Sequence, residues 1–320
     1  DKKTGLEFIK GHGAVPVSID ESDCDTWAHG KARFSGETQE FTLKTIKAIE
    51  EGPLRAGIRM TSTLNTSILV QDFLLRHDSP EIEVRVRLDL REKHRAIKLG
   101  FGVNVEDPVA TYEIPYGYIS RPTDGRENPG QQWIDVSGTG ENGEIKGLTL
   151  LNDAKFSYDV LGSTMRMTIA RSPMYADHFG IRDDFPYFLD QGIQEFKYAL
   201  IPHSGDWREA NPSRKAQELN EPSVQVAGSP HKGTLPQTLE FIRIDARNVI
   251  ATALKRSEDN DGFILRCYET DGADTQVRIE LPLLGRAWDA RFGSCEIKTF
   301  WIPEDAAGAV EERNLVEMKL

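Results

Sequence analysis

Three consecutive segments between residues 63 and 105 alternate apolar and polar residues at every second position. They read SILVQDFLLRH (67–77), IEVRVRLDLRE (82–92) and AIKLGFGVNV (96–105). Because successive side chains of a β-strand point to opposite faces, this alternation predicts neighbouring antiparallel strands with one face in the core and one in water. The charged residues of the solvated face are expected to form charge ladders and not a site: Arg85, Arg87, Asp89, Arg91 and Glu92.

Short apolar segments separated by turn residues continue along the rest of the chain. Further strands are predicted at 14–19, 40–49 and 54–60, and later at 238–244, 248–255, 262–269, 275–281 and 296–301. Residues 211–220, with Pro212 in the first turn, predict a helix. The sequence therefore predicts an all-β protein with a large antiparallel sandwich in 1–222, a linker in 223–235 and a small β-sandwich in 236–320.

Charge and hydropathy exclude two classes of partner. The 320 residues carry a formal net charge of -12, whereas nucleic acids and anionic membranes attract clustered Lys and Arg. No stretch of about 18 apolar residues is present, and no secretory signal opens the chain. We therefore expect no nucleic acid and no membrane as partner. Asp1 stands in an expected turn, so we also expect further sequence upstream of it.

The cysteines are three in number, Cys24, Cys267 and Cys295, and they lie far apart without CxxC spacing. An odd, dispersed set predicts reduced, partly buried thiols and neither a disulfide framework nor a zinc ribbon. From reduced thiols we predict a cytoplasmic location.

Ionisable and amide side chains are concentrated between apolar segments in residues 113–173. They are Glu113, Arg121, Asn152, Asp153, Lys155, Asp159 and Arg171. Polar groups held at the edge of a rigid sheet are suited to binding a polyhydroxylated ligand. Buried carboxylates and arginines also pair with one another in large β-proteins, so the residues alone leave both interpretations open.

A second, purely structural interpretation is open for three of these positions: Glu113, Arg121 and Asp153. Tyr116 and Tyr118 are expected to project to the same side of an interrupted strand. Arg121 and Tyr116 either bind hydroxyl groups, or Arg121 pairs with Glu113 and holds two strands together. Asp153 either caps its own turn or faces a groove.

Several patterns resemble functional motifs but have simpler explanations. A loop in 174–192 is rich in metal-ligand types but lacks zinc or EF-hand spacing, so we predict no metal there. GTGENG (138–143) lacks a βαβ context and is expected to be a hairpin turn. His203, Ser204 and Asp206 are too close in sequence for a hydrolase triad. Trp27 and His29 either face a pocket or are a packed aromatic and a hydrogen-bonded histidine, and we predict the second. The metal-ligand types in the loop are Asp177, His178, Asp183, Asp184 and Asp190.

Several strings in order resemble the C-terminal β-region of glycoside hydrolase family 38, the α-mannosidases. They are EIPYG (113–117) followed by Arg121 and Pro122, LLNDAKFSYD (150–159), RSP (171–173) and EFKYALIPHSGDW (195–207). Residues 1–9 and 22–30 resemble the opening strands of that region, and residues 239–269 and 296–300 resemble its last β-domain. The chain departs from the family at Leu90, where Trp is commoner, and near Gln194, where a His is common.

The resemblance implies a mutarotase-like super-sandwich followed by a small β-sandwich. It also implies a retaining α-mannosidase, whose two carboxyl groups act about 5 Å apart. In the family these groups, and the ligands of a divalent metal such as zinc, belong to an N-terminal β/α barrel that this chain does not contain. The resemblance therefore implies no catalytic residue and no metal ligand here. It assigns Arg171 to the position of an arginine near the sugar and Asp190 to a turn that reaches toward the catalytic part.

We accordingly predict the non-catalytic C-terminal part of an α-mannosidase, inactive alone. It would pack on the catalytic barrel of the same polypeptide, help to bind an α-mannoside or glycan, and offer a surface for a homo-oligomer. The predicted substrate-binding residues are Arg171, Asp190, Arg121, Glu113, Tyr116 and Asp153. One alternative is a stand-alone carbohydrate-binding sandwich that uses Trp133 or Trp207 as a platform. Another is a lyase or mutarotase that uses Tyr, His and Glu on the sandwich face.

Overall fold

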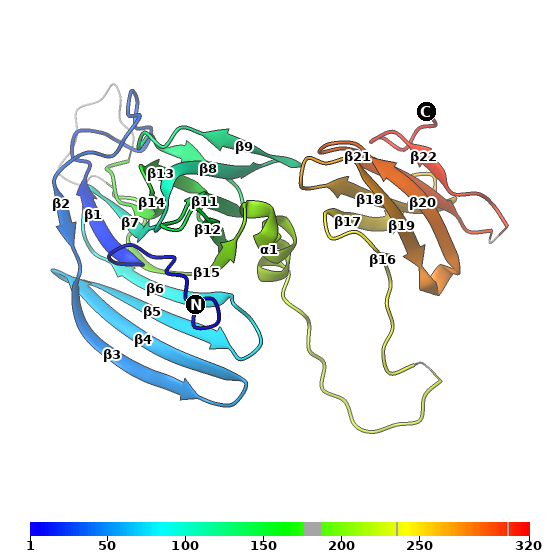
Figure 1. The fold of residues 1–320 in the computed structure, drawn as a ribbon, viewed down its shortest axis with the longest axis horizontal. Helices are drawn as coiled ribbons and strands as arrows, with labels where there is room; N and C mark the ends of the chain where they lie inside the picture. The colour runs from blue at the N-terminus through cyan, green and yellow to red at the C-terminus, as the bar shows by residue number, and fades with distance from the viewer. Residues whose placement is uncertain (176–186, 235, 306) are drawn as a thin grey trace. The chain divides into compact units, whose positions relative to one another are not determined.

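The structure is a computed structural model that describes residues 1–175, 187–234, 236–305 and 307–320. The chain divides into two compact units, both built from antiparallel sheets (Figure 1). The first unit holds Asp1–Glu113 and Ile119–Asn220. The second unit holds Glu221–Leu320 together with the short segment Ile114–Tyr118, which the sequence did not predict. The predicted fold class, a large antiparallel sandwich plus a small β-sandwich, is confirmed.

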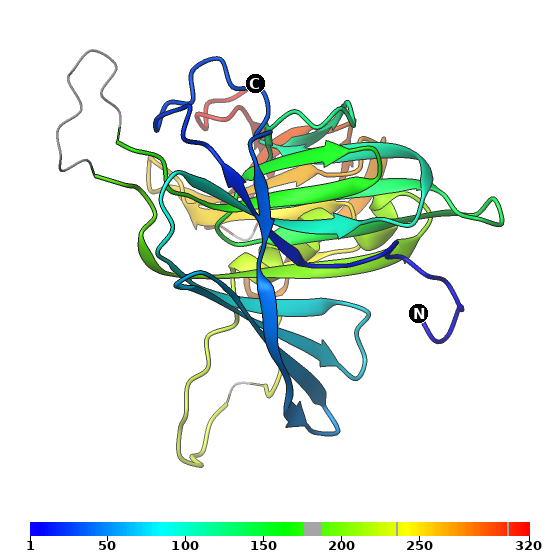
Figure 2. The same cartoon turned by 90° about the vertical axis from the view of Figure 1, so that its left-hand side faces the viewer.

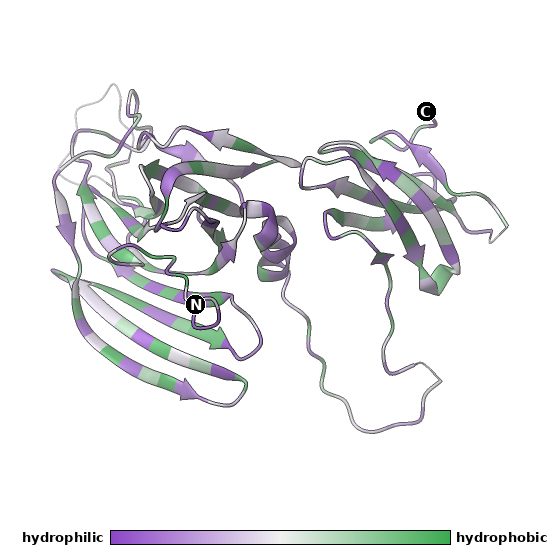
Figure 3. Cartoon of the chain, viewed as in Figure 1, coloured by the Kyte–Doolittle hydropathy of each residue, from purple (hydrophilic) through white to green (hydrophobic). Residues whose placement is uncertain are grey.

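The larger sheet of the first unit has nine strands. Their order is β3 (Thr42–Glu51), β4 (Arg55–Leu64), β5 (Ser67–Arg76), β6 (Ile82–Leu90), β15 (Gly192–Ser204), β12 (Ile145–Asn152), β11 (Trp133–Thr139), β8 (Glu106–Ile114) and β9 (Gly117–Arg121). The first two alternating segments form β5 and β6, which pair antiparallel as predicted. Hydrophobic and hydrophilic residues alternate along β3–β5 (Figure 3).

The smaller sheet of the first unit has six strands. Their order is β10 (Asn128–Pro129), β13 (Ser157–Leu161), β14 (Thr164–Arg171), β7 (Arg95–Gly102), β1 (Val15–Asp20) and β2 (Thr38–Glu40). The third alternating segment is β7, which pairs with β1 and β14 and not with β6. The prediction of three neighbouring strands is wrong at this point because β7 is buried on both faces and belongs to the opposite sheet.

The core of the first unit fills the space between the two sheets. Alternate residues of β6, such as Val84 and Leu88, meet Leu99 and Phe101 of β7 and Met167 of β14 in one buried cluster. The larger sheet is wider than the smaller one, and β3–β5 project away from the stacked strands (Figure 2).

One helix covers the opposite face of β11 and β12. The short 3-10 helix η1 (Trp207–Ala210) leads into α1 (Pro212–Asn220), which confirms the predicted helix. The indole of Trp133 donates to the Ser213 hydroxyl at 3.2 Å and stacks on Trp207 at a centroid distance of 5.1 Å. Among the described residues, no helix is long and apolar enough to cross a membrane.

The second unit is a sandwich of two small sheets. One contains β16 (Arg243–Ile244), β19 (Thr275–Leu281) and β20 (Arg286–Phe292); the other contains β17 (Val249–Arg256), β18 (Gly262–Glu269), β21 (Ile297–Pro303) and β22 (Glu311–Arg313). A short 3-10 helix η2 (Pro282–Leu284) links β19 to β20. Val249, Leu265, Ile279, Phe292 and Ile302 form its core. Residues 221–234 are outside any helix or strand.

A single buried carboxylate organises one end of this sandwich. Glu269 closes β18 with no exposed surface. Its oxygens accept hydrogen bonds of 2.7–3.1 Å from the backbone N–H groups of Asp271, Gly272, Ala273 and Cys295 and from the Asn248 amide. Two loops and the start of β17 therefore depend on one side chain.

Glu269→Ala should lower the free energy of unfolding of the second unit by about 3 kcal/mol or more, because buried donors lose their acceptor together. Differential scanning calorimetry should show the transition of the second unit moving down while that of the first unit stays in place. Glu258→Ala, at an exposed turn of the same unit, should leave both transitions unchanged. Equal effects of the two substitutions would contradict this role of Glu269.

Candidate functional site

Arg171 ends β14 and lies in a partly buried ion pair. Its Nε and Nη2 donate to Oε2 of Glu21 at 3.0 and 2.7 Å. Glu21 follows β1, so the pair joins the ends of two strands of the six-stranded sheet. Burial raises the pKa of Glu21, and the charge and hydrogen bonds of Arg171 oppose that shift. The pair is a fixed element of the structure, since removing one partner would leave a buried charge.

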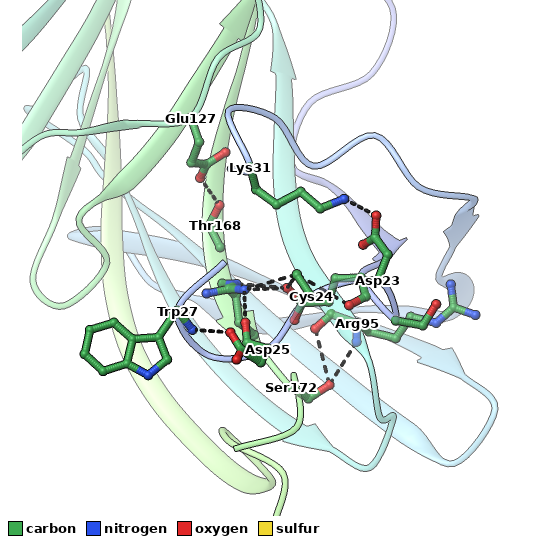
Figure 4. A network of polar contacts seen from close by, with 12 residues as sticks. Asp23, Cys24, Asp25, Trp27, Lys31, Arg95, Glu127, Thr168 and Ser172 are labelled. Atoms are coloured by element: carbon green, nitrogen blue, oxygen red, sulfur yellow. Dashed lines mark hydrogen bonds and ion pairs between the residues drawn. The ribbon is translucent and has the colours of Figure 1, made fainter. Parts of the chain in front are cut away.

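The same guanidinium holds the loop that follows β1. Nη2 of Arg171 lies 3.4 Å from the Asp25 carbonyl oxygen and 3.9 Å from Sγ of Cys24. In the same loop the backbone N–H of Trp27 donates to Asp25 Oδ1 at 2.8 Å, and the indole points away from the other residues drawn in Figure 4. The Trp27 side chain is 66% exposed and stacks on His29, so the prediction that Trp27 is packed is wrong.

Asp190 lies next to Arg171 and contacts its backbone. Its Oδ2 accepts from the backbone N–H of Arg171 at 2.9 Å. Asp190 has a φ of 50°, a left-handed conformation that Asp tolerates better than most residues. We call Glu21, Cys24, Arg171 and Asp190 the Arg171 cluster.

A second group of polar side chains continues from Asp190. Gln194 donates from Nε2 to the Asp190 carbonyl oxygen at 3.0 Å, and its Oε1 accepts from Nζ of Lys155 at 2.8 Å. The Lys155 ammonium also lies 5.0 Å from the centroid of the Phe196 ring. Burial lowers the pKa of Lys155, and the charges of Asp190 and Asp153 oppose that shift.

Asp153 lies beside this second group and joins its turn to β15, whereas the turn itself is capped by Asn152, whose Oδ1 accepts from the backbone N–H groups of Ala154 and Lys155 at 3.0 and 2.6 Å. Oδ1 of Asp153 accepts from the backbone N–H of Lys197 at 2.8 Å, and its own N–H donates to the Lys197 carbonyl at 3.2 Å. Asp190 thus contacts Arg171 directly and Lys155 through Gln194, whereas Asp153 acts on Lys155 through its charge. We call Asp153, Lys155, Gln194 and Phe196 the Lys155 cluster. Lys155 was absent from the predicted site, although it stands in the LNDAK string.

Arg121 and Glu113 lie elsewhere in the first unit, and they do not pair. Arg121 directs Nη1 to Asn128 Oδ1 at 3.5 Å and Nη2 to the Pro129 carbonyl at 3.3 Å. Its guanidinium lies 5.4 Å from the centroid of the Tyr112 ring. No ion pair between Arg121 and Glu113 occurs in the part of the chain that the structure describes, so that alternative is wrong. The end of β9 directs Arg121 toward the loop around β10.

Glu113 is a buried carboxyl without a cationic partner among the described residues. Its Oε2 accepts from the backbone N–H of Gln132 at 2.6 Å. Burial raises the pKa of Glu113 to about 7, and hydrogen bonds from Gln132 and Trp133 oppose that shift. The group is therefore largely protonated in weakly acidic solution.

Tyr116 is grouped with the second unit, apart from the other predicted residues. It has a φ of 57° in the turn between β8 and β9, and its ring meets Tyr268 edge to face at 5.3 Å. The prediction that Tyr116 and Tyr118 share one side of a strand is wrong, because the chain reverses at Tyr116.

The glycine turn, His203, the cysteines and two tryptophans complete the list of sequence patterns that the structure places. Glycines 140 and 143 form the hairpin turn between β11 and β12. His203 pairs through Nε2 with the buried Asp135 at 2.8 Å, not with Ser204 or Asp206. Cys24 and Cys267 are buried free thiols, and Cys295 is partly buried. Trp133 and Trp207 are buried under α1, so neither is an exposed platform for sugar.

Metal-ligand residue types are not clustered in the described part of the chain. Among residues 1–175, 187–234, 236–305 and 307–320, no group of three His, Cys, Asp or Glu side chains is arranged to hold a metal ion. Four of the residues considered in the loop at 174–192 lie outside the described residues: Asp177, His178, Asp183 and Asp184.

Raising the pH should weaken the first unit through Glu113. Its folded pKa of about 7 lies above the usual 4.5. Its stabilising contribution is therefore fully present below pH 4.5 and is lost as the pH rises through 7. Glu113→Gln should remove up to about 3 kcal/mol of this pH dependence. Urea unfolding between pH 4.5 and 8 measures it.

The control is Glu106→Gln, at the exposed start of the same strand. The free energy of unfolding of this variant should depend on pH as that of the wild type does. The assignment to Glu113 fails if Glu113→Gln retains the full wild-type slope across this window.

Two family models match the chain. Residues 21–179 match the glycosyl hydrolases family 38 C-terminal domain. Residues 248–319 match the glycosyl hydrolases family 38 C-terminal beta sandwich domain. The first match contains the Arg171 cluster except Asp190, and the second covers most of the small sandwich.

Curated relatives are similar along most of the chain. Alpha-mannosidase G of Dictyostelium discoideum is 27% identical over 309 residues, which are 89% of this chain and 26% of the relative. Human alpha-mannosidase 2C1 is 29% identical over 254 residues, 75% of this chain and 23% of the relative. A putative mannosylglycerate hydrolase of Halalkalibacterium halodurans is 28% identical over 312 residues, 84% of this chain and 33% of the relative. The chain thus spans only a minor part of each relative.

Solved structures share the fold. A family 38 protein from Enterococcus faecalis aligns with 94% of this chain and 41% of its own, with a TM-score of 0.78 and 17% identity. An alpha-mannosidase from the same species gives a TM-score of 0.76 with 39% of its own chain covered. Together the two family models match residues 21–179 and 248–319. The chain therefore belongs to glycoside hydrolase family 38 and contains the family's C-terminal domain and C-terminal β-sandwich domain.

Proposed function

We propose that this chain is the non-catalytic C-terminal part of a retaining α-mannosidase. It packs on the catalytic barrel of a longer polypeptide and helps to shape the pocket for a terminal α-mannoside. The names of the relatives support this proposal, since two of those described above are alpha-mannosidases. So does the share of each relative that the chain covers, 26% and 23%. A cytoplasmic location and a homo-oligomeric state remain part of the proposal.

The observation that carries the proposal is the link from Arg171 to Lys155. Two basic residues, Arg171 and Lys155, and their three amide or carboxyl partners, Glu21, Asp190 and Gln194, are held by one another within hydrogen-bond distances of 2.7–3.0 Å. A side chain fixed in this way loses little conformational entropy when it contacts a ligand. Under the proposal, these side chains line the rim of the sugar pocket. Sugar hydroxyl groups accept hydrogen bonds from basic donors and donate hydrogen bonds to carboxylates.

The divalent metal that the family implies does not fit the described residues of this chain. They offer no group of three ligand-type side chains, so no chemical step is assigned to a metal here. Under the proposal, the metal ligands and the two reacting carboxyl groups belong to the catalytic part. The residues of this chain help to bind and orient the sugar.

Replacing the Arg171–Glu21 pair in the longer polypeptide should lower kcat/KM for an aryl α-mannoside about tenfold to a hundredfold, because the rim loses its position. The variant is Arg171→Ala combined with Glu21→Gln, so that no buried carboxylate is left without its cation. Steady-state kinetics measure the effect, and calorimetry shows whether the fold persists.

Arg85→Ala provides the control. Arg85 is exposed on the larger sheet and paired with Glu83 at 2.8 Å, so its loss should leave kcat/KM unchanged. Wild-type kinetics in the folded Arg171 double variant would remove Arg171 from the site. Absence of α-mannosidase activity in the wild-type longer polypeptide would refute the proposed function itself.

A further inference from the structure

The apolar face of the larger sheet continues past the sheet that covers it. One cross-strand row runs through Tyr198, Val84, Phe73, Ile58 and Ala48. Tyr198 and Val84 are fully buried in the core, Phe73 is partly buried, and Ile58 is 48% exposed. Exposure rises steadily along a row of side chains that all face the same way.

The next row repeats this gradient. It runs through Phe196, Val86, Gln71, Met60 and Ile46. The first three are buried, Met60 is partly buried, and Ile46 is 59% exposed. The two rows leave the core at β4 and β3, the strands that project away from the stack in Figure 2. Leu43, Ile46, Ala48, Ile58 and Met60 form a surface that we call the open face.

The other side of the same strands is polar. Thr45 pairs with Thr61, and Lys47 pairs with Arg59, which donates to both oxygens of Asp72 at 2.7 Å. One side of β3 and β4 therefore carries polar side chains suited to contact with water. The other side carries exposed apolar side chains of the kind found in a protein core. Contiguous exposed apolar surface of this kind marks an interaction site.

The edge strand argues against extension of the sheet by a second copy. The register of β3 shifts between Leu43 and Thr45 and again between Ala48 and Glu50. Lys44 and Lys47 also lie along this edge. Bulges and lysines are the devices by which exposed edge strands avoid pairing with another chain. The occupant should therefore cover the open face rather than add a strand to β3.

We propose that the open face is the docking surface for the catalytic part of the longer polypeptide. This inference rests on the proposed function. The chain covers 41% and 26% of two relatives, so in those proteins much polypeptide lies outside the region matched here. The five residues of the open face are apolar, and the face continues directly into a folding core, as permanent interfaces do.

Amide hydrogen exchange in β3 and β4 tests the proposal. In the longer polypeptide these amides should exchange at least tenfold more slowly than in the 320-residue chain alone. Ile46→Glu combined with Ile58→Glu should bring exchange in the longer polypeptide back to the rate in the isolated chain. In the isolated chain the same variant should keep the wild-type melting temperature, because both side chains are already about half exposed.

The matched control is Thr45→Glu combined with Thr61→Glu, on the opposite face of the same two strands. It should leave the protection intact. Equal exchange in the isolated chain and the longer polypeptide overturns the proposal, as does equal loss of protection in both variants. A dimer of the isolated chain, measured by light scattering and abolished by the Ile46 and Ile58 variant, overturns it too, since the occupant is then a second copy.

Mannosidase assays on the longer wild-type polypeptide separate this inference from the proposed function. If the longer polypeptide hydrolyses the mannoside but its β3 and β4 amides exchange as fast as in the isolated chain, the docking surface alone is refuted. Protection without activity refutes the mannosidase function and leaves the docking surface supported.

Discussion

A buried lysine fixes the outer face of the six-stranded sheet. The Lys98 side chain, in the middle of β7, has no exposed surface, and its ammonium group pairs with Asp159 on β13 at 2.5 Å and with Glu127. Desolvation would raise the pKa of Glu127, but Lys98 and hydrogen bonds from Thr168 and Ser157 lower it. Buried ions need this degree of pairing to be tolerated. The loop before β10 is thereby tied to three strands at once.

The same lysine positions the loop that carries half of the Arg171 cluster. The Phe34 ring lies 5.4 Å from the Lys98 ammonium and 4.9 Å from the Arg171 guanidinium. Cations are attracted to the face of an aromatic ring, most strongly where water is excluded. The loop that contains Phe34 also supplies Glu21 and Cys24. The Arg171 cluster therefore lies at strand ends of the smaller sheet, beside a loop that these cation–ring contacts hold in place.

The sequence predicted strands and the helix well, because period-two alternation and Pro212 are local signals. It named both Arg171 and Asp190 through the family resemblance, but it did not predict the contact between them. It failed where contacts depend on pairing between distant strands. Lys155 reaches Gln194 because β12 pairs with β15, and no local pattern encodes that register. The alternative in which Arg121 pairs with Glu113 was wrong for a related reason. Charge and spacing do not reveal toward which loop the end of a strand points.

The open face shows a further limit of sequence patterns. Alternation tells which side of a strand is apolar, but not whether another layer covers that side. β5 and β6 are covered at their inner positions, whereas β3 and β4 have the same alternation and are left open. The difference follows from the widths of the two sheets, nine strands against six. An uncovered apolar sheet face is unfavourable in water, and the docking proposed above would remove that cost.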